Sequence, residues 1–310
     1  MFNYQIQTPV AFIIFKRRDT TARVFEAIRQ VKPPKLLVIA EGRCPDWPGE
    51  DQECAAARAI IDQVDWDCEV LKNYADVNFG CRLQVSSGRN WVFYQGEEAI
   101  ILEDDCLPHP TFFRFTEELL EGYRDDLRIL SISGQNVQLG RKRTDYSYYL
   151  SRYNHCWSWA SWRRAWQHYD LDMKLWPEIR DGNFLMDVLG DSNAVKTGKN
   201  IFQICYEKKL QSWACQWTFA KFIQNGMNIL TNVKLASNIG HGVGGTNTED
   251  VKSPYSNMPI EAITFPMKHP PFVIRDMQAD NFTQKTLFDY YSPLLKKVQK
   301  KVDKLLKQFR

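Results

Sequence analysis

The chain has 310 residues, 44% of them hydrophobic and 25% charged, which is the composition of a globular protein large enough for one α/β domain. Its net charge of only +3 gives no overall basic field and no nucleic-acid-binding motif is present, so nucleic acid is excluded as an expected partner. The eight cysteines form no CxxC pair and the N-terminus shows no signal peptide, so we expect reduced thiols, no zinc site and a cytoplasmic protein.

The first half of the chain alternates between apolar runs and amphipathic stretches. Buried parallel strands are continuously hydrophobic, and such runs predict strands at 9–15, 36–40, 68–71, 99–102 and 129–132. Helices are predicted between and after them, at 19–30, 50–63, 80–95 and 110–123. This alternation predicts an α/β fold, a Rossmann-type parallel sheet with helices on both faces. Ligands bind beyond the carboxyl ends of such strands, so the expected functional loops are 16–19, 41–49 and 103–109.

The second half is less regular. Its predicted elements are a strand at 146–149, a tryptophan-rich helix at 157–169, one or two helices within 200–224, a strand at 235–238, and an irregular, proline-containing stretch at 250–283. At helical spacing, Trp159, Trp162 and Trp166 share one face and are expected to fill the core. Trp157 lies off that face, which makes it the better candidate for stacking on an acceptor sugar.

Three adjacent acids, Glu103, Asp104 and Asp105, follow the predicted strand at 99–102. Neighbouring carboxylates repel one another, and a divalent cation would offset that repulsion. Mg²⁺ and Mn²⁺ prefer oxygen ligands and can bridge carboxylates to a diphosphate. A solvated acidic turn or a helix N-cap cluster is the alternative interpretation of the same three residues.

The residues around this triplet resemble the GT-A glycosyltransferases, in particular the inverting N-acetylglucosaminyltransferase I family and its bacterial relatives. The likeness covers roughly 9–248 and rests on the opening strand, the triplet with Pro108 and Phe112-Phe113 after it, the tryptophan-rich segment ending at Trp176-Pro177, and Asn238-Ile-Gly-x-Gly. It implies a metal-dependent glycosyltransferase using a UDP- or GDP-sugar donor and a glycan or lipid-linked acceptor. It also implies one GT-A-like domain over 1–285, with a nucleotide-sugar-binding half at 1–135 and an acceptor half at 136–285.

The resemblance assigns roles to individual residues. Asp105 would ligate Mn²⁺ or Mg²⁺, and Glu103 and Asp104 would contact the ribose or the transferred sugar. The other donor-binding residues would be Glu41 at the base or ribose, Arg17 or Arg18 at the diphosphate, and Arg82 at the nucleotide. Their ordinary alternatives are an exposed loop acid, a solvated basic loop and a helix-surface arginine.

Two positions depart from the family pattern. Ala214 stands where the inverting family carries the aspartate that serves as general base, so Glu207 and Asp187 become the candidates for that role. Asn247 stands where the bacterial relatives carry a histidine, and His241 is then a candidate for binding metal or phosphate. A histidine packed in the fold or placed on the surface is the alternative for His241.

The last 25 residues, 286–310, are predicted to form a basic amphipathic helix. Within 294–310, seven basic residues accompany one acid, and apolar residues recur at helical spacing. Such a helix suits peripheral contact with an anionic inner-membrane surface, or it docks on the domain or on a partner.

Two other functions remain open at this stage. A sugar nucleotidyltransferase would share the architecture, but such enzymes carry a glycine-rich phosphate loop after the first strand, and residues 15–24 contain no glycine. A non-catalytic nucleotide-sugar-binding protein of the same fold would be consistent with Ala214.

Overall fold

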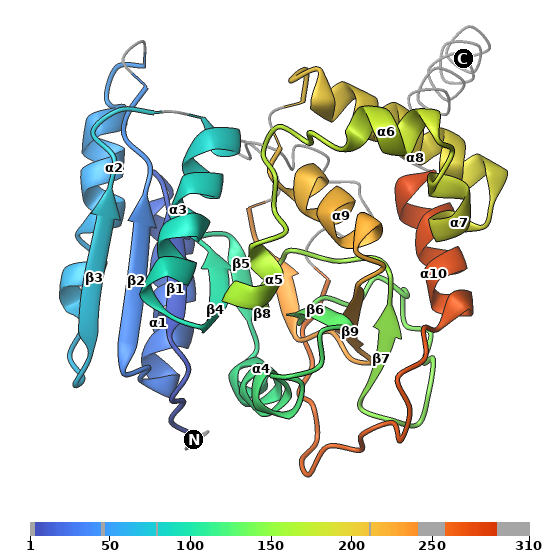
Figure 1. Cartoon of the computed structure of the whole chain (residues 1–310). Coiled ribbons are helices and arrows are strands. Elements are labelled where there is room, and N and C mark those ends of the chain that lie inside the picture. Colours follow the sequence, from blue (N-terminus) through green and yellow to red (C-terminus); the bar gives the residue numbers. More distant parts are fainter. Residues whose placement is uncertain (1–3, 45–46, 79, 211, 241–257, 290–310) are drawn as a thin grey trace, which may run out of the picture.

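The computed structural model describes residues 4–44, 47–78, 80–210, 212–240 and 258–289. Its centre is an eight-stranded mixed sheet in the order β3-β2-β1-β4-β8-β6-β9-β7, and β5 and β10 form a separate two-stranded sheet (Figure 1). The strands are β1 (Val10–Ile14), β2 (Lys35–Ala40), β3 (Glu69–Tyr74), β4 (Glu98–Glu103), β5 (Cys106–Pro108), β6 (Ile129–Ser133), β7 (Tyr148–Ser151), β8 (Trp159–Trp162), β9 (Met227–Thr231) and β10 (Ala236–Asn238).

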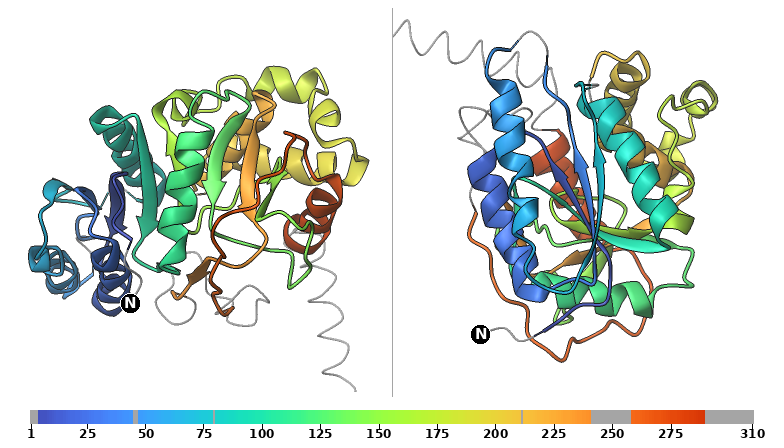
Figure 2. Two further views of the ribbon diagram at one scale, coloured as in Figure 1. Left: turned by 90° about the horizontal axis from the view of Figure 1, so that it is seen from below. Right: turned by 90° about the vertical axis from the view of Figure 1, so that its left-hand side faces the viewer.

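The first half of the chain folds as the sequence predicts. Strands β3, β2, β1 and β4 are parallel neighbours. Helices α1 (Arg18–Val31) and α2 (Glu50–Arg58) lie on one face of these strands and α3 (Cys81–Gln95) lies on the other (Figure 2). The predicted helix at 50–63 is divided into α2 and a short 3-10 turn, η1 (Ile61–Gln63). The α/β fold with helices on both faces is therefore confirmed.

Helices of the second half extend the same layers. Apolar side chains of α4 (Thr111–Gly122) share one core with those of α1, whereas α5 (Arg163–Trp166) and α9 (Ala214–Ile223) share the other core with α3. The remaining helices are α6 (Trp176–Asp181), α7 (Leu185–Leu189), α8 (Ser192–Tyr206), α10 (Met277–Thr283) and a π-helical turn, η2 (Gln284–Phe288). Where one or two helices were expected within 200–224, the structure has the end of α8 and the whole of α9. The stretch predicted to be irregular, 250–283, ends in helix α10.

The tryptophan-rich helix predicted at 157–169 is wrong. This segment contains the strand β8, antiparallel to β4 and β6, followed by the single helical turn α5. Trp159 and Trp162 lie on opposite faces of the sheet, in different cores, and Trp166 packs beside Trp159. All three tryptophans are buried, as expected, but they do not form one helical face. A three-residue spacing imitates a helix here because helices cover both faces of this central strand.

The expectation of reduced cysteines is wrong for one pair. Cys205 at the end of α8 and Cys215 in the first turn of α9 form a disulfide, with their Cα atoms 6.7 Å apart. The turn between the two helices brings together residues that are 10 positions apart, which no cysteine motif announces. Five other described cysteines are free thiols: Cys44, Cys54, Cys68, Cys106 and Cys156.

Some predicted features lie outside the described residues. They are His241, the rest of the glycine-rich loop after Gly240, and the basic tail from residue 290 onward. Within the described part of the chain, no helix has the length and apolar character that crossing a membrane requires. The two predicted halves, 1–135 and 136–285, contribute strands to the same sheet, because β8 pairs with β4.

Candidate active site

The acidic triplet lies at the carboxyl end of β4, at the edge of the sheet where the parallel strands end. Glu103 is the last residue of β4, and Asp104 and Asp105 form the turn into β5. The backbone fixes this turn from two sides: the Asp104 amide donates to the Ile13 carbonyl of β1 at 2.9 Å, and the Ile239 amide donates to the Asp105 carbonyl at 2.7 Å. The predicted place of the triplet, at the rim of the sheet, is therefore what the fold shows.

Arg17, in the loop after β1, bridges two of the acids. Its Nη2 lies 2.7 Å from Asp104 Oδ1, and its Nη1 lies 2.9 Å from Asp105 Oδ2. Asp104 also accepts a hydrogen bond from the Phe15 backbone amide at 3.1 Å. The sequence predicted Arg17 as a partner of the donor diphosphate, and its position beside both aspartates was not foreseen.

Glu103 has a partner that sequence reasoning missed. Arg89 of α3, fully buried, donates from Nη2 to Glu103 Oε1 at 2.8 Å. Helical periodicity could have indicated that Arg89 is buried. Arg89 follows Val85 by four residues and precedes Val92 by three, so it lies on the apolar face of the helix. A cation on such a stripe requires a buried partner.

Burial governs the electrostatics of the triplet. It raises the pKa of Asp104 to about 7, opposed by the charge of Arg17 and assisted by that of Asp105. Burial likewise raises the pKa of Glu103, against the opposing charge of Arg89. Three acids thus face two guanidinium groups, and an added cation would favour the ionised form of all three.

The triplet offers ligands of the kind that a hard divalent cation prefers. Ligand atoms of Glu103, Asp105 and Cys106 all lie within 4.8 Å of one another. The Cys106 thiol is fully buried, which raises its pKa well above the usual value, and it donates to Asp105 Oδ1 at 3.2 Å. Mg²⁺ and Mn²⁺ prefer oxygen to sulfur ligands, so the two carboxylates are the groups that would hold such a cation.

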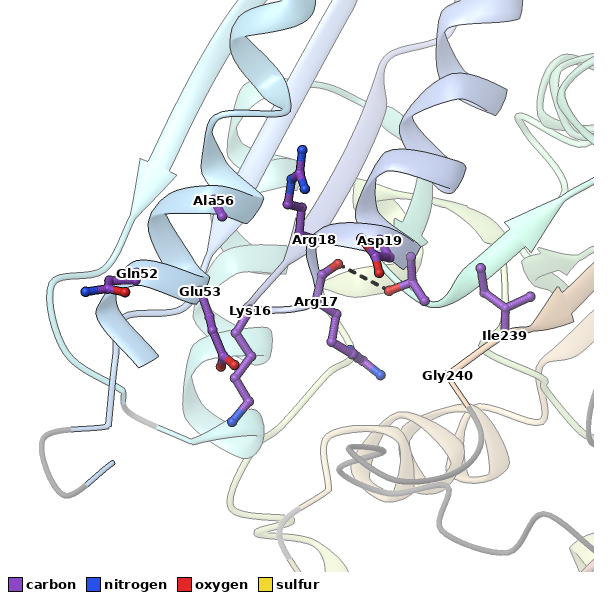
Figure 3. A pocket seen from close by; sticks show the side chains of 10 residues that line it. Lys16, Arg17, Arg18, Asp19, Gln52, Glu53, Ala56, Ile239 and Gly240 are labelled. Carbon is purple, nitrogen blue, oxygen red and sulfur yellow. Dashed lines mark hydrogen bonds between the residues drawn. The ribbon is translucent and has the colours of Figure 1, made fainter. Parts of the chain in front are cut away.

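An open pocket of about 560 Å³ lies beside the triplet. Lys16, Arg17 and Arg18 line it together with the acids Asp19 and Glu53 and with Ile239 and Gly240. In Figure 3 the side chain of Arg17 extends toward Gly240, whereas that of Arg18 points away from it. The fold therefore brings both predicted diphosphate partners, Arg17 and Arg18, to one pocket. Lys16 is paired there with Glu50 at 2.6 Å, and Arg17 with the two aspartates.

Glu41 follows directly after β2, in one of the three predicted functional loops. Its side chain is half-buried, and Oε1 is buried without a hydrogen-bond partner in the described structure. Burial, with a smaller contribution from the charge of Glu50, raises its pKa to about 7. An unpaired, half-buried carboxyl can accept or donate a hydrogen bond to a ligand, whereas an ordinary exposed loop acid would be solvated.

Arg82 is already engaged within the protein. The side chain is buried, and its Nη2 donates to the Leu171 carbonyl at 3.0 Å and to Asp172 Oδ1 at 3.3 Å. These bonds join the start of α3 to the loop before α6. Contact between Arg82 and a nucleotide remains a prediction.

Trp157 is half-buried in the connection between β7 and β8. The Nζ of Lys234 lies 5.9 Å from the centre of its ring. The next residue, Ser158, donates from Oγ to the Cys106 carbonyl at 3.2 Å, which ties this connection to the turn that carries the triplet. The half-buried Trp157 is therefore the sequence neighbour of a residue that is bonded to the acidic turn, and its role toward an acceptor remains a prediction.

The two base candidates lie on the surface of the second half. Glu207 caps the end of α8, where Lys209 pairs with it at 2.6 Å and Gln203 donates to it at 2.8 Å, and these contacts lower its pKa. Asp187 is exposed on α7. The lowered pKa of Glu207 is unfavourable for a general base, which works best with a pKa near the working pH.

Comparison with known proteins identifies no family. No protein-family profile matches the chain, and no curated protein matches it. Among solved structures, the crystal structure of UDP-glucose pyrophosphorylase complexed with UDP-glucose is similar over 47% of this chain, with 14% sequence identity and a TM-score of 0.27. This chain spans 62% of the length of that structure.

Proposed function

We propose that this protein is a metal-dependent glycosyltransferase that moves a sugar from a nucleoside-diphosphate donor to an acceptor hydroxyl. The observation that carries the proposal is that the triplet lies beside a pocket lined by Lys16, Arg17 and Arg18, at the edge where the parallel strands of the sheet end. Ligands of α/β sheets bind at that edge. Carboxylates alone suit many cations, and basic side chains alone suit many anions, but the two together suit a diphosphate bound with a divalent cation.

In this proposal, Asp105 holds Mg²⁺ or Mn²⁺, as the sequence predicts. Glu103, which the sequence assigned to the ribose or the transferred sugar, is proposed as the second ligand because its carboxylate lies within 4.8 Å of that of Asp105. The cation would offset the negative charge that grows on the departing diphosphate. Arg17 and Arg18 line the place for the diphosphate. Glu41, with its unpaired carboxyl, is the candidate for reading the base or the ribose. The Asp104 carboxyl, held by the Phe15 amide and by Arg17, keeps the loop after β1 against the triplet.

The acceptor side of the proposal rests on Trp157. Trp157 supplies a partly accessible aromatic face near the acidic turn, as sugar-binding sites commonly do. Ala214, the first residue of α9, carries no carboxyl, so the proton of the acceptor hydroxyl needs another base. Glu207 and Asp187 keep that proposed role only if the acceptor reaches the surface on which they lie.

The test is a thermal-shift screen of UDP-, GDP-, CMP- and dTDP-sugars with and without Mn²⁺, followed by product analysis. We expect one class of donor to stabilise the protein only when the metal is present, and to be hydrolysed slowly to nucleoside diphosphate and free sugar. Asp105→Asn should abolish the metal-dependent shift, because it removes a ligand charge with almost no change in shape. The control is Asp145→Asn, since Asp145 is an exposed acid paired with Lys142 on the surface.

The products separate this function from its rivals. Release of a nucleoside triphosphate and a sugar phosphate when pyrophosphate is added would identify a nucleotidyltransferase. Metal-dependent binding of a donor without turnover, in the presence of a range of acceptors, would identify a binding protein. A chain that no donor stabilises, with or without Mn²⁺, would contradict the proposal altogether.

A further inference from the structure

Arg89 is unusual among the cations near the triplet because the protein encloses it completely. Its side chain is 0% exposed, whereas that of its partner Glu103 is 31% exposed. The guanidinium carbon lies 3.4 Å from the centre of the Trp213 ring and 5.6 Å from that of Trp159. The two indoles stack on each other with centroids 5.8 Å apart. The indole rings of Trp213 and Trp159 therefore pack against Arg89 and leave its guanidinium little freedom to reorient.

The backbone of α3 also helps to hold Arg89 in place. At the preceding residue, Gly88, an added Cβ would fall 2.8 Å from a side-chain carbon of Ile39 in β2, so the helix lies as close to the sheet as glycine permits. Arg89 Nη1 donates back to the Val85 carbonyl, one turn earlier in the same helix, at 3.2 Å. Helix, sheet and indole ring thus fix the direction in which Nη2 points, which is toward Glu103.

Glu103 needs such an anchor. Its carboxylate is next to Asp105 in the cluster, and the charge of Asp105 opposes its ionisation. A partly exposed glutamate in that position would lower its energy by turning toward water, away from the other acid. The contact with Arg89 opposes that rotation and keeps a Glu103 oxygen within 4.8 Å of the Asp105 oxygen.

We propose that Arg89, clamped by Trp213, is a positioning residue that holds Glu103 in the orientation needed to bind a divalent cation together with Asp105. This inference rests on the proposed function for the identity of the ligand, a hard divalent cation, but the orientation of Glu103 can be tested without it. Side chains that orient metal ligands typically change metal affinity by about 10- to 100-fold when they are removed.

The experiment compares Arg89→Met with a matched control, Arg152→Met. Arg152 is also buried, lies 5.0 Å from the Tyr153 ring and pairs with an acid, Asp280, at 3.8 Å, but it belongs to the β7 end of the sheet. Mn²⁺ binding is measured by the EPR signal of the free ion, and folding by thermal melting. We expect R89M to bind Mn²⁺ about 10- to 100-fold more weakly than the parent, and R152M to bind it as the parent does even where the two variants lose similar stability.

The position of Glu103 and the Mn²⁺ affinity of two further variants also test the inference. In a crystal structure of R89M without metal, the Glu103 carboxylate should turn away from Asp105; in Arg89→Lys it should stay, and Mn²⁺ affinity should recover in part. If R89M does not fold, Trp213→Leu removes the clamp but leaves the arginine, and it should weaken Mn²⁺ binding less than tenfold. An R89M protein with parental Mn²⁺ affinity and an unmoved Glu103 overturns the inference. A parent protein that binds no Mn²⁺ overturns the proposed function. The positioning role of Arg89 is then tested only by the orientation of Glu103 in the R89M crystal structure.

Discussion

Gly240 lies so close to Asp105 that a Cβ at this glycine would fall 2.6 Å from Asp105 Oδ2 and 2.7 Å from Arg17 Nη1. A methyl group therefore cannot be added without displacing the carboxylate or the guanidinium. The sequence singled out this glycine only as part of the segment Asn238-Ile-Gly-x-Gly, and the structure supplies a physical reason for it.

Gly240→Ala should weaken metal and donor binding more than it weakens the fold. Two of the three nearest atoms are the ends of side chains, which can shift at a modest cost, but the third is Asp105 Cβ at 2.7 Å, so Asp105, the proposed metal ligand, must itself move. We expect Mn²⁺ affinity to fall at least about tenfold, as when a ligand is misoriented, with a small change in melting temperature. Gly122→Ala is the control, because a Cβ there meets nothing within 4 Å. Parental Mn²⁺ affinity in G240A would show that Asp105 does not hold the ion.

Glu41→Gln should alter the dependence of stability on pH. The pKa of Glu41 is about 7 in the folded protein, against an ordinary value of 4.5. Between these values the folded state binds more protons than the unfolded state, so this carboxyl makes stability fall as pH rises from about 5 to 7, and the loss persists above pH 7. Glutamine has no such titration, so the variant should exceed the parent by on the order of 1 kcal/mol at pH 8, a value reduced for solvent screening.

Urea denaturation of both proteins at pH 5, 6, 7 and 8 measures this difference. The gap between E41Q and the parent should be smallest at pH 5 and should widen up to about pH 7. Glu53→Gln, at an exposed acid of α2, is the control and should not produce a gap that widens in this way. A constant difference between E41Q and the parent at all four pH values would contradict the raised pKa of Glu41.

The sequence predicted the parallel half of the fold because local signals agree there. Each strand is a continuous apolar run, each helix has its own periodicity, and the connections are short, so neighbouring elements along the chain are neighbours in space. The position of Asp105 at the rim follows directly from that order. The partners of the triplet could not be predicted in the same way, because Arg17 and Arg89 reach it through tertiary packing from β1 and α3.

The predictions for the tryptophan-rich segment and for the cysteines were wrong because the local sequence pattern was ambiguous or absent. Trp159 and Trp162 are spaced as on a helix, but they flank a strand that is covered on both faces. Cys205 and Cys215 carry no motif, and only the return of the chain between α8 and α9 brings them together. The general base stays a prediction, because Glu207 was selected by its place in the sequence and the fold places it on the surface, paired with Lys209.

Alanine substitutions at Trp157 and at Trp159 should have different effects, the first on binding of the acceptor and the second on the stability of the fold. Trp159 is 1% exposed and packs against other tryptophans, so Trp159→Ala should cost about 3–5 kcal/mol of stability, as core truncations of this size do. Trp157 is half-buried, and its truncation should cost less. If Trp157 stacks on the acceptor, W157A should retain donor hydrolysis with Mn²⁺ but lose transfer to acceptor. Equal loss of hydrolysis and transfer in W157A would contradict a role confined to the acceptor.

The disulfide should contribute measurably to stability. Cross-linking residues 10 positions apart restricts the unfolded chain, which for a loop of this length is worth about 2–3 kcal/mol on the chain-entropy estimate. We expect Cys205→Ala/Cys215→Ala to lower the free energy of unfolding by about this amount, and a reductant to lower the parent toward the variant while leaving the variant unchanged. Cys68→Ser, at a free thiol, is the control and should respond to reductant as the parent does. Identical urea midpoints for the parent with and without reductant would show that Cys205 and Cys215 are not paired.

The disulfide should also affect metal binding. Trp213 lies between the two cysteines in sequence and contacts Arg89. The Cys205→Ala/Cys215→Ala variant should therefore bind Mn²⁺ more weakly than its loss of stability alone explains.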